Sequence, residues 1–219
     1  MDIQAPSGTT SDTRRFRIAF IVAFSFALLL WVFHFVGYIS EYDFSQFGIY
    51  PRRVVGLVGV LGAPFIHASV SHLFANTPPI IVIGTMLLYG YPQASKVFLP
   101  VVYLGSGVAV WLFAREAYHI GASGLAFGML FFVFTIGVLR WERRTIAISL
   151  LVFFLYGGMI SGVIPGAQEI SFESHLSGAL IGILLAFLLR HRDPESPRKQ
   201  YNWEHEETES DDYDWPDRE

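Results

Sequence analysis

The chain has 219 residues, of which 53% are hydrophobic and 16% charged, and its mean hydropathy is +0.44. Soluble domains usually carry about a quarter charged residues, so this composition excludes an ordinary soluble protein. Cysteine is absent, which excludes disulfide frameworks, Cys-ligated zinc, iron–sulfur clusters and thiol catalysis. The net charge of −4 indicates little about partners, because most of the acidic residues lie in one C-terminal stretch.

Six apolar runs are long enough, or nearly so, to cross a bilayer as helices, which takes roughly 18 residues. They cover approximately residues 18–36, 71–89, 97–113, 121–139, 145–164 and 172–189. We expect no cleavable signal peptide, because the first run is too long for the apolar core of one. Pro78 and Pro79 are expected in the first turns of the second run, where a missing backbone N–H is tolerated. The sequence therefore predicts an all-α polytopic membrane protein.

The segments between the runs predict the domain boundaries and the orientation. Residues 1–17 form a polar N-terminal segment, residues 18–190 the membrane domain, and residues 191–219 an acidic, disordered tail. The long connection 37–70 mixes charged and apolar residues, so we expect it to be structured and partly embedded at the membrane interface. Basic residues favour the side that holds both termini; these are Arg14, Arg15, Arg17, Lys96, Arg140, Arg143, Arg144, Arg190, Arg192, Arg198 and Lys199. Basic residues concentrate on the cytoplasmic side, so both termini are predicted to be cytoplasmic.

Four polar residues in or beside the spans are candidates for function, because membrane helices exclude such groups unless they face protein or water. They are His72, Asn76, Ser123 and His175. His72 and Asn76 are four residues apart, so they share one face of the second span, and both side chains can donate hydrogen bonds to an oxyanion. His67 is five residues before His72; on a helix it would point away from that face, so a structural role is expected.

Ser123 and His175 are predicted to lie at the same depth. Ser123 opens the fourth span between Gly121 and Gly124, and His175 opens the sixth, and both spans run in the same direction. Small-xxx-small glycine pairs in both spans, Gly124 with Gly128 and Gly178 with Gly182, would let the two helices pack backbone to backbone. A serine hydroxyl needs a base to become nucleophilic, and neutral histidine is the usual one. Glu173 lies two residues before His175 and therefore on another face of the helix, and no other Asp or Glu lies within the spans to orient the imidazole, so the sequence predicts a Ser–His dyad.

Three motifs resemble those of the rhomboid intramembrane proteases: His67-Ala-Ser-Val-Ser-His72-Leu-Phe-Ala-Asn76, Gly121-Ala-Ser123-Gly124 and His175-Leu-Ser-Gly178-Ala-Leu-Ile-Gly182. The resemblance implies a six-helix rhomboid-like bundle with a water-filled cavity open to the outside. Ser123 would be the nucleophile and His175 the general base; His72, Asn76 and the Ser123 N–H would form the oxyanion site. Phe127 stands where the family commonly has a Tyr that packs on the catalytic His.

The resemblance also implies the partners and the location. The substrate would be the transmembrane segment of another membrane protein, within the bilayer of a prokaryotic plasma membrane. No cofactor, metal ion or nucleic acid is expected. Two alternatives stay open: a catalytically inactive rhomboid-like protein that binds membrane clients, and a small transporter. The retained dyad argues against the first, and the lack of charged residues near the bilayer midplane argues against the second.

Overall fold

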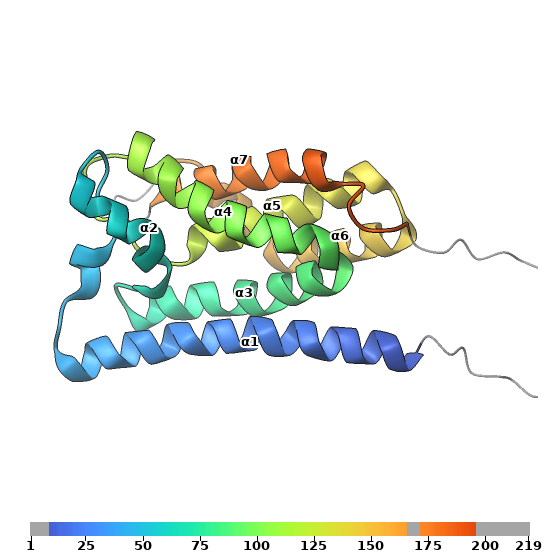
Figure 1. Cartoon of the computed structure of the whole chain (residues 1–219), viewed down its shortest axis with the longest axis horizontal. Helices are drawn as coiled ribbons and strands as arrows, with labels where there is room; N and C mark the ends of the chain where they lie inside the picture. Colours follow the sequence, from blue (N-terminus) through green and yellow to red (C-terminus); the bar gives the residue numbers. More distant parts are fainter. Residues whose placement is uncertain (1–8, 166–170, 196–219) are drawn as a thin grey trace, which may run out of the picture.

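The structure, a computed structural model, describes residues 9–165 and 171–195 (Figure 1). Its α-helices are α1 (Thr9–Ser40), α2 (Val58–Gly62), α3 (Val70–Gly90), α4 (Pro92–Phe113), α5 (Ser123–Arg140), α6 (Arg143–Tyr156) and α7 (Phe172–Leu189). Short 3-10 helices lie at Phe44–Phe47 (η1), Val54–Leu57 (η2), Ala63–Phe65 (η3) and Gly157–Val163 (η4). Within these residues, six helical segments are long and apolar enough to cross a membrane. The predicted all-α, six-span architecture is therefore confirmed.

The expected spans differ from the helices mainly at their ends. The first helix begins at Thr9, well before the expected start near residue 18, because a helix can continue past the apolar run into polar sequence. α4 begins at Pro92 rather than near residue 97, since proline fits the first turn of a helix. Pro78 and Pro79 lie inside α3, in its third turn, so their expected placement near the start of that helix is wrong.

α5 is the central helix of the bundle. It contacts α3, α4, α6 and α7, whereas α1 packs along α3 at one side of the molecule (Figure 1). In the most apolar window of α5, 67% of the residues are buried, against 22% in α1. A residue at the start of α5 is therefore surrounded by other helices, which makes this the position best shielded from lipid.

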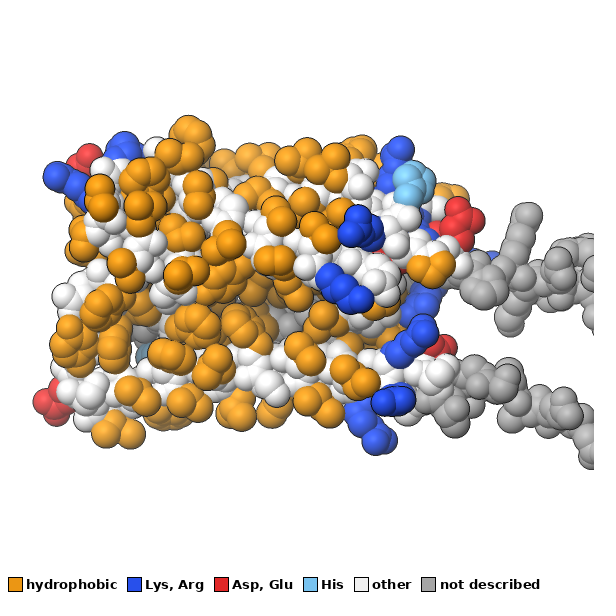
Figure 2. Space-filling view, in the orientation of Figure 1, with side chains coloured by type: hydrophobic (Ala, Val, Ile, Leu, Met, Phe, Trp, Pro, Cys, Tyr) orange, Lys and Arg blue, Asp and Glu red, His pale blue; other side chains and the backbone are white. Residues whose placement is uncertain are grey.

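The two ends of the bundle differ in charge. The start of α1 and the end of α7 lie at the same end (Figure 1), and Lys and Arg side chains gather mainly at that end, whereas the middle is apolar and the opposite end carries both basic and acidic side chains (Figure 2). This arrangement fits the predicted topology, although the side on which each end lies stays a prediction. The N-terminal residues before residue 9 and the predicted acidic tail after residue 195 lie outside the described residues.

The long connection between α1 and α3 is structured, as expected. It contains η1, η2, α2 and η3 in succession. Its apolar side chains include the exposed Val54 and Leu61, which are 81% and 63% exposed. Exposed aliphatic groups of this kind fit a membrane interface better than bulk water. Its embedding in that interface stays a prediction.

The residues after α7 fold back onto the start of α4. Asp193 is buried, and its two carboxylate oxygens accept the backbone N–H groups of Gln93 at 2.8 Å and Ala94 at 2.9 Å. The guanidinium of Arg140 donates to the backbone carbonyls of Asp193 and Pro194 at 3.1 and 3.0 Å. Asp193 thus satisfies two backbone donors at a helix N-terminus, where helices lack internal acceptors. These contacts extend to Pro194, beyond the predicted domain end at residue 190.

Candidate active site

Ser123 is the first residue of α5, and its side chain is buried, with 6% of the residue exposed. The turn before it depends on Gly121, which has φ +107°, a conformation that residues with a Cβ rarely adopt. A Cβ at Gly121 would also lie 2.8 Å from Cε1 and Nε2 of the His72 imidazole. The backbone N–H of Gly121 donates to the carbonyl of Ala63 at 2.8 Å. Ser123 therefore stands at a helix N-terminus on a fixed turn with an imidazole packed against it.

The imidazole of His175 lies on the same face of α5 as Ser123. Its ring stacks on Phe127 with the two centroids 4.0 Å apart and the planes 6° from parallel. Phe127 follows Ser123 by four residues, so the two side chains lie one above the other on α5. The structure thus places His175 against Phe127, on the helix face that Phe127 shares with Ser123, and the stacking does not need the hydroxyl of a Tyr at position 127.

A backbone carbonyl orients His175. Its Nδ1 lies 2.9 Å from the carbonyl oxygen of Gly162 in η4. A carbonyl oxygen only accepts, so Nδ1 carries the proton, and Nε2 is left with a free lone pair. Nε2 is the nitrogen that a general base needs. This partner could not be predicted from the sequence, because Gly162 is 13 residues before His175 and lies in a separate element.

Glycines bring α5 and α7 into backbone contact. A Cβ on Gly178 would overlap the carbonyl oxygen of Gly124, and a Cβ on Gly182 would overlap that of Gly128. Both predicted small-residue pairs therefore meet each other across the interface, in register. This packing places the first turn of α7, which carries His175, beside the first turn of α5.

His72 packs against the turn that precedes the nucleophile, and Asn76 follows one turn later on α3. The His72 ring lies against Gly121, as described above. Asn76 is buried, and its Nδ2 donates to the backbone carbonyl of His72 at 3.0 Å. The amide group of Asn76 is thus turned toward its own helix, and one of its two N–H bonds is available for another acceptor.

His67 packs against His72, so the expectation that it points away from His72 is wrong. The two ring centroids are 5.0 Å apart. The helical spacing does not apply, because α3 begins at Val70 and the preceding Ser69 is extended, with φ −155° and ψ 161°. His67 is buried, and among the residues that the structure describes neither of its ring nitrogens has a partner at hydrogen-bond distance and angle. Burial, reinforced by the neighbouring His72, lowers the pKa of His67 to about 4.

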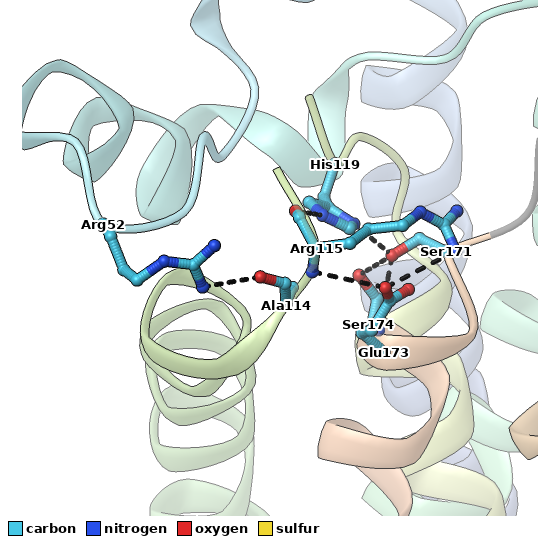
Figure 3. A network of polar contacts seen from close by, with 7 residues as sticks. All are labelled: Arg52, Ala114, Arg115, His119, Ser171, Glu173 and Ser174. Carbon is cyan, nitrogen blue, oxygen red and sulfur yellow. Dashed lines mark hydrogen bonds and ion pairs between the residues drawn. The ribbon is translucent and has the colours of Figure 1, made fainter. Parts of the chain in front are cut away.

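A further histidine that the sequence analysis did not single out is His119, four residues before Ser123. It is 2% exposed, and both its ring nitrogens have partners: Ser171, at the start of α7, and the carbonyl of Arg115 (Figure 3). His119 lies two residues before the Gly121-Ala-Ser123-Gly124 motif, and this proximity was the only indication of its role in the sequence. Within residues 9–165 and 171–195, no group of three His, Cys, Asp or Glu side chains is arranged to hold a metal ion.

Comparison with known proteins gives the family. A family model described as the Rhomboid domain matches residues 55–192. The chain is 31% identical over 195 residues to the uncharacterized protein Rv1337 of Mycobacterium tuberculosis, covering 85% of this chain and 81% of that protein. It is 30% identical over 193 residues to the uncharacterized protein ML1171 of Mycobacterium leprae, covering 84% and 76%. RHOMBOID-like protein 2 of Arabidopsis thaliana is 28% identical over 150 residues, 66% of this chain and 44% of that protein. Because the family model covers more than half of its length, the chain belongs to the rhomboid family.

Proposed function

We propose that this protein is an intramembrane serine endopeptidase in which Ser123 is the nucleophile and His175 the general base. The observation that carries the proposal is the state of the His175 imidazole. It is stacked on Phe127 over the face of α5 that holds Ser123, and its Nδ1 proton is given to the Gly162 carbonyl. An imidazole held in this way presents an unprotonated Nε2, which suits proton abstraction from a serine hydroxyl.

The chemistry follows from these groups. His175 Nε2 takes the proton of Ser123 as Oγ attacks the carbonyl carbon of the scissile peptide bond, which gives a tetrahedral intermediate. The imidazolium then gives the proton to the leaving nitrogen, and the acyl-enzyme forms. Water attacks that ester with His175 again as base, and the carboxylic acid product leaves with Ser123 restored. The Gly162 carbonyl takes the orienting role that a carboxylate has in a triad, without a buried charge.

Donors for the oxyanion surround the nucleophile. Ser123 begins α5, where backbone N–H groups have no acceptor within the helix. His72 lies against the Gly121 turn, and Asn76 keeps one N–H beyond its bond to the helix. We assign the oxyanion site to His72, Asn76 and the Ser123 N–H, with Asn76 turning from its own helix to the substrate oxygen when the oxygen becomes charged.

The surroundings favour a transmembrane segment as the substrate. A cavity of about 610 Å³ lies between the end of α1 and the connection that follows, and Phe33, His34, Phe65, His67 and Ile120 are among its lining residues. His67 joins this cavity to His72 and so to the nucleophile turn. We propose that the enzyme cuts membrane-protein segments near their outer end, in a prokaryotic plasma membrane, with both its own termini cytoplasmic.

The test is labelling by a fluorophosphonate, together with cleavage of a model transmembrane substrate by the purified protein. The wild type is expected to label and to cleave, whereas Ser123→Ala and His175→Ala should do neither while remaining folded. The double variant should be no worse than either single one, because the two residues act as a unit. Ser95→Ala is the matched control, since Ser95 is also a buried serine near a helix start and bonds the Pro92 carbonyl at the opposite end of the bundle.

Two results would contradict the proposal. A folded Ser123→Ala that still cleaves would remove the nucleophile assignment. A folded wild type that neither labels nor cleaves would favour the alternative, a catalytically inactive rhomboid-like protein that binds membrane clients.

A further inference from the structure

His119 connects the loop that precedes the nucleophile to the helix that carries the base. Its backbone is fixed on one side by an antiparallel bridge to Ile49, with both N–H···O distances 2.9 Å. Its side chain points the other way, toward the start of α7 (Figure 3). The residue is 2% exposed, in a loop whose neighbours Arg115 and Glu116 are exposed. A polar ring that is buried in an exposed loop needs hydrogen-bond partners inside the protein, which indicates a structural or functional role.

The hydrogen bonds of His119 run in one direction. Nε2 lies 3.0 Å from the carbonyl oxygen of Arg115, which only accepts, so Nε2 carries the proton. Nδ1 is then an acceptor, and the hydroxyl of Ser171, 2.6 Å away, donates to it. Since the single Ser171 proton is used there, the hydroxyl of Ser174, 2.7 Å from Ser171 Oγ, donates to Ser171. The order is Ser174, Ser171, His119, carbonyl of Arg115.

This chain of bonds reaches the first turn of α7. Ser171 is the N-cap of that helix and accepts the Ser174 N–H at 3.3 Å. His175 follows Ser174 directly. Burial lowers the pKa of His119, which favours the neutral ring in which Nδ1 is an acceptor. A second tie runs in parallel, because the Arg115 backbone N–H and guanidinium both approach Oε1 of Glu173, at 3.4 and 3.5 Å.

We propose that His119 is a positioning residue for the reaction: by holding the Ser171 hydroxyl, it fixes where α7 begins and thus where the His175 imidazole stands relative to Ser123. The inference rests on the proposed protease function. Glycine contacts between α5 and α7 hold the two helices together along their length. Before Gly178, the first turn of α7 meets α5 through the Ser174 carbonyl, which lies against Gly124, and the Ser171–His119 bond and the Arg115–Glu173 pair hold this turn from the side of the loop.

Three substitutions of His119 separate the effect of its hydrogen bond to Ser171 from the effect of the volume of its ring. His119→Asn keeps an acceptor oxygen near the place of Nδ1, His119→Gln keeps an N–H near the place of Nε2, and His119→Phe keeps only the ring. We expect His119→Phe to lower kcat on the order of 100-fold with KM unchanged, the size of effect that a small misplacement of a reacting group has. His119→Asn should recover most of kcat, and His119→Gln should not.

Ser171 gives an independent check. Ser171→Ala should lower kcat about as much as His119→Phe, on the order of 100-fold, and the double variant should lose little more, because both changes break one connection. Asp193→Ala is the control for a weakened fold, since Asp193 caps α4 at the other end of the bundle. It should lower the melting temperature and leave kcat unchanged below that temperature.

A distance measurement tests the same inference without activity. Because the chain has no cysteine, spin labels can be placed on cysteines introduced at Phe113 and at Leu176, next to His175, which are 82% and 38% exposed. The distance distribution between them should broaden in His119→Phe and keep its width in His119→Asn. Wild-type kcat in His119→Phe, equal losses in the Phe and Asn variants, or unchanged distances would overturn the inference. A wild type that does not label with fluorophosphonate would contradict the protease proposal instead, and the distances would still decide the role of His119.

Discussion

At the scale of single residues, the site is built from side chains held by backbone groups. His175 is oriented by the Gly162 carbonyl, Asn76 is bonded to the His72 carbonyl, and His119 is bonded to the Arg115 carbonyl. Backbone acceptors carry no net charge, so they can orient a buried imidazole without the cost of burying a carboxylate. This suits a site enclosed by membrane helices.

Loss of one oxyanion donor should slow turnover without weakening substrate binding. Asn76→Ala is expected to lower kcat on the order of ten- to a hundredfold, less than the roughly 100- to 1000-fold seen in a soluble serine protease, because His72 and the Ser123 N–H remain. His72→Ala should behave alike, and the double variant should fall well below either. Steady-state cleavage of a model substrate measures both kcat and KM.

Thr77→Val is the matched control for Asn76→Ala. Thr77 is the next residue of α3, and its hydroxyl donates to the Leu73 carbonyl at 2.8 Å, a bond of the same kind as that of Asn76. It also accepts a hydrogen bond from Trp31 at 3.0 Å. Thr77→Val should therefore lower stability and leave kcat unchanged. An equal loss of kcat in both variants would show that Asn76 acts through the helix alone.

His67 makes stability depend on pH. Its pKa falls from 6.5 to about 4 in the folded protein, chiefly through burial. Between these two values the unfolded chain binds a proton that the folded one refuses, so stability is full above pH 6.5 and decreases as the pH falls toward 4. The loss at pH 5 should be about 2 kcal/mol, from about 1.4 kcal/mol per pH unit. The melting temperature of the purified protein at pH 7 and pH 5 measures it.

The comparison that isolates His67 is His67→Phe, which keeps the ring contact with His72. Between pH 7 and pH 5, the melting temperature of this variant should decrease less than that of the wild type. His191→Phe, an exposed position beyond α7, should retain the full wild-type loss. An unchanged pH dependence in His67→Phe would show that another group is responsible.

At the scale of helices, the contact between α5 and α7 is the part of the fold closest to the chemistry. Gly178→Ala should force the two helices apart, because the new Cβ would overlap the Gly124 carbonyl. Overpacking of this kind lowers the free energy of unfolding by about 1–3 kcal/mol. Because it also displaces His175, kcat should fall as well. Thermal unfolding and cleavage rate measure the two effects. Gly158→Ala in η4 is the control, since a Cβ there meets nothing within 4 Å; equal behaviour of the two variants would contradict the close crossing.

The helices and the glycine crossing could be predicted because each depends on local sequence. An apolar run predicts a span by its length, and glycines at Gly178 and Gly182 predict a close face by their spacing. The Gly162 carbonyl and the His119 contacts could not, because each joins elements whose distance is set by tertiary packing. The prediction for His67 was wrong for a local reason, because a helical period was applied to a residue that precedes the start of α3 at Val70.

At the scale of the whole molecule, the placement of the charges supports a topology that can be tested directly. A reporter fused after Glu219 is expected to read cytoplasmic, and one inserted in the connection between α1 and α3 is expected to read external. Basic residues near α1, α4 and the end of α7 favour this orientation. Accessibility of the reporters in intact cells measures it. A cytoplasmic reading for the connection would mean that Ser123 and His175 open to the side opposite to the one proposed.

The contact between Asp193 and the first turn of α4 joins two segments that the ribosome synthesises at different times. The two partners Gln93 and Asp193 are 100 positions apart. At roughly 5–20 residues per second, a ribosome adds Gln93 about 5–20 seconds before it adds Asp193. During that interval the backbone N–H groups of Gln93 and Ala94 lack the carboxylate that accepts them in the finished fold. A chain that ends between Leu189 and Asp193 therefore contains all six spans but lacks the contact that joins the start of the third span to the residues after the last one.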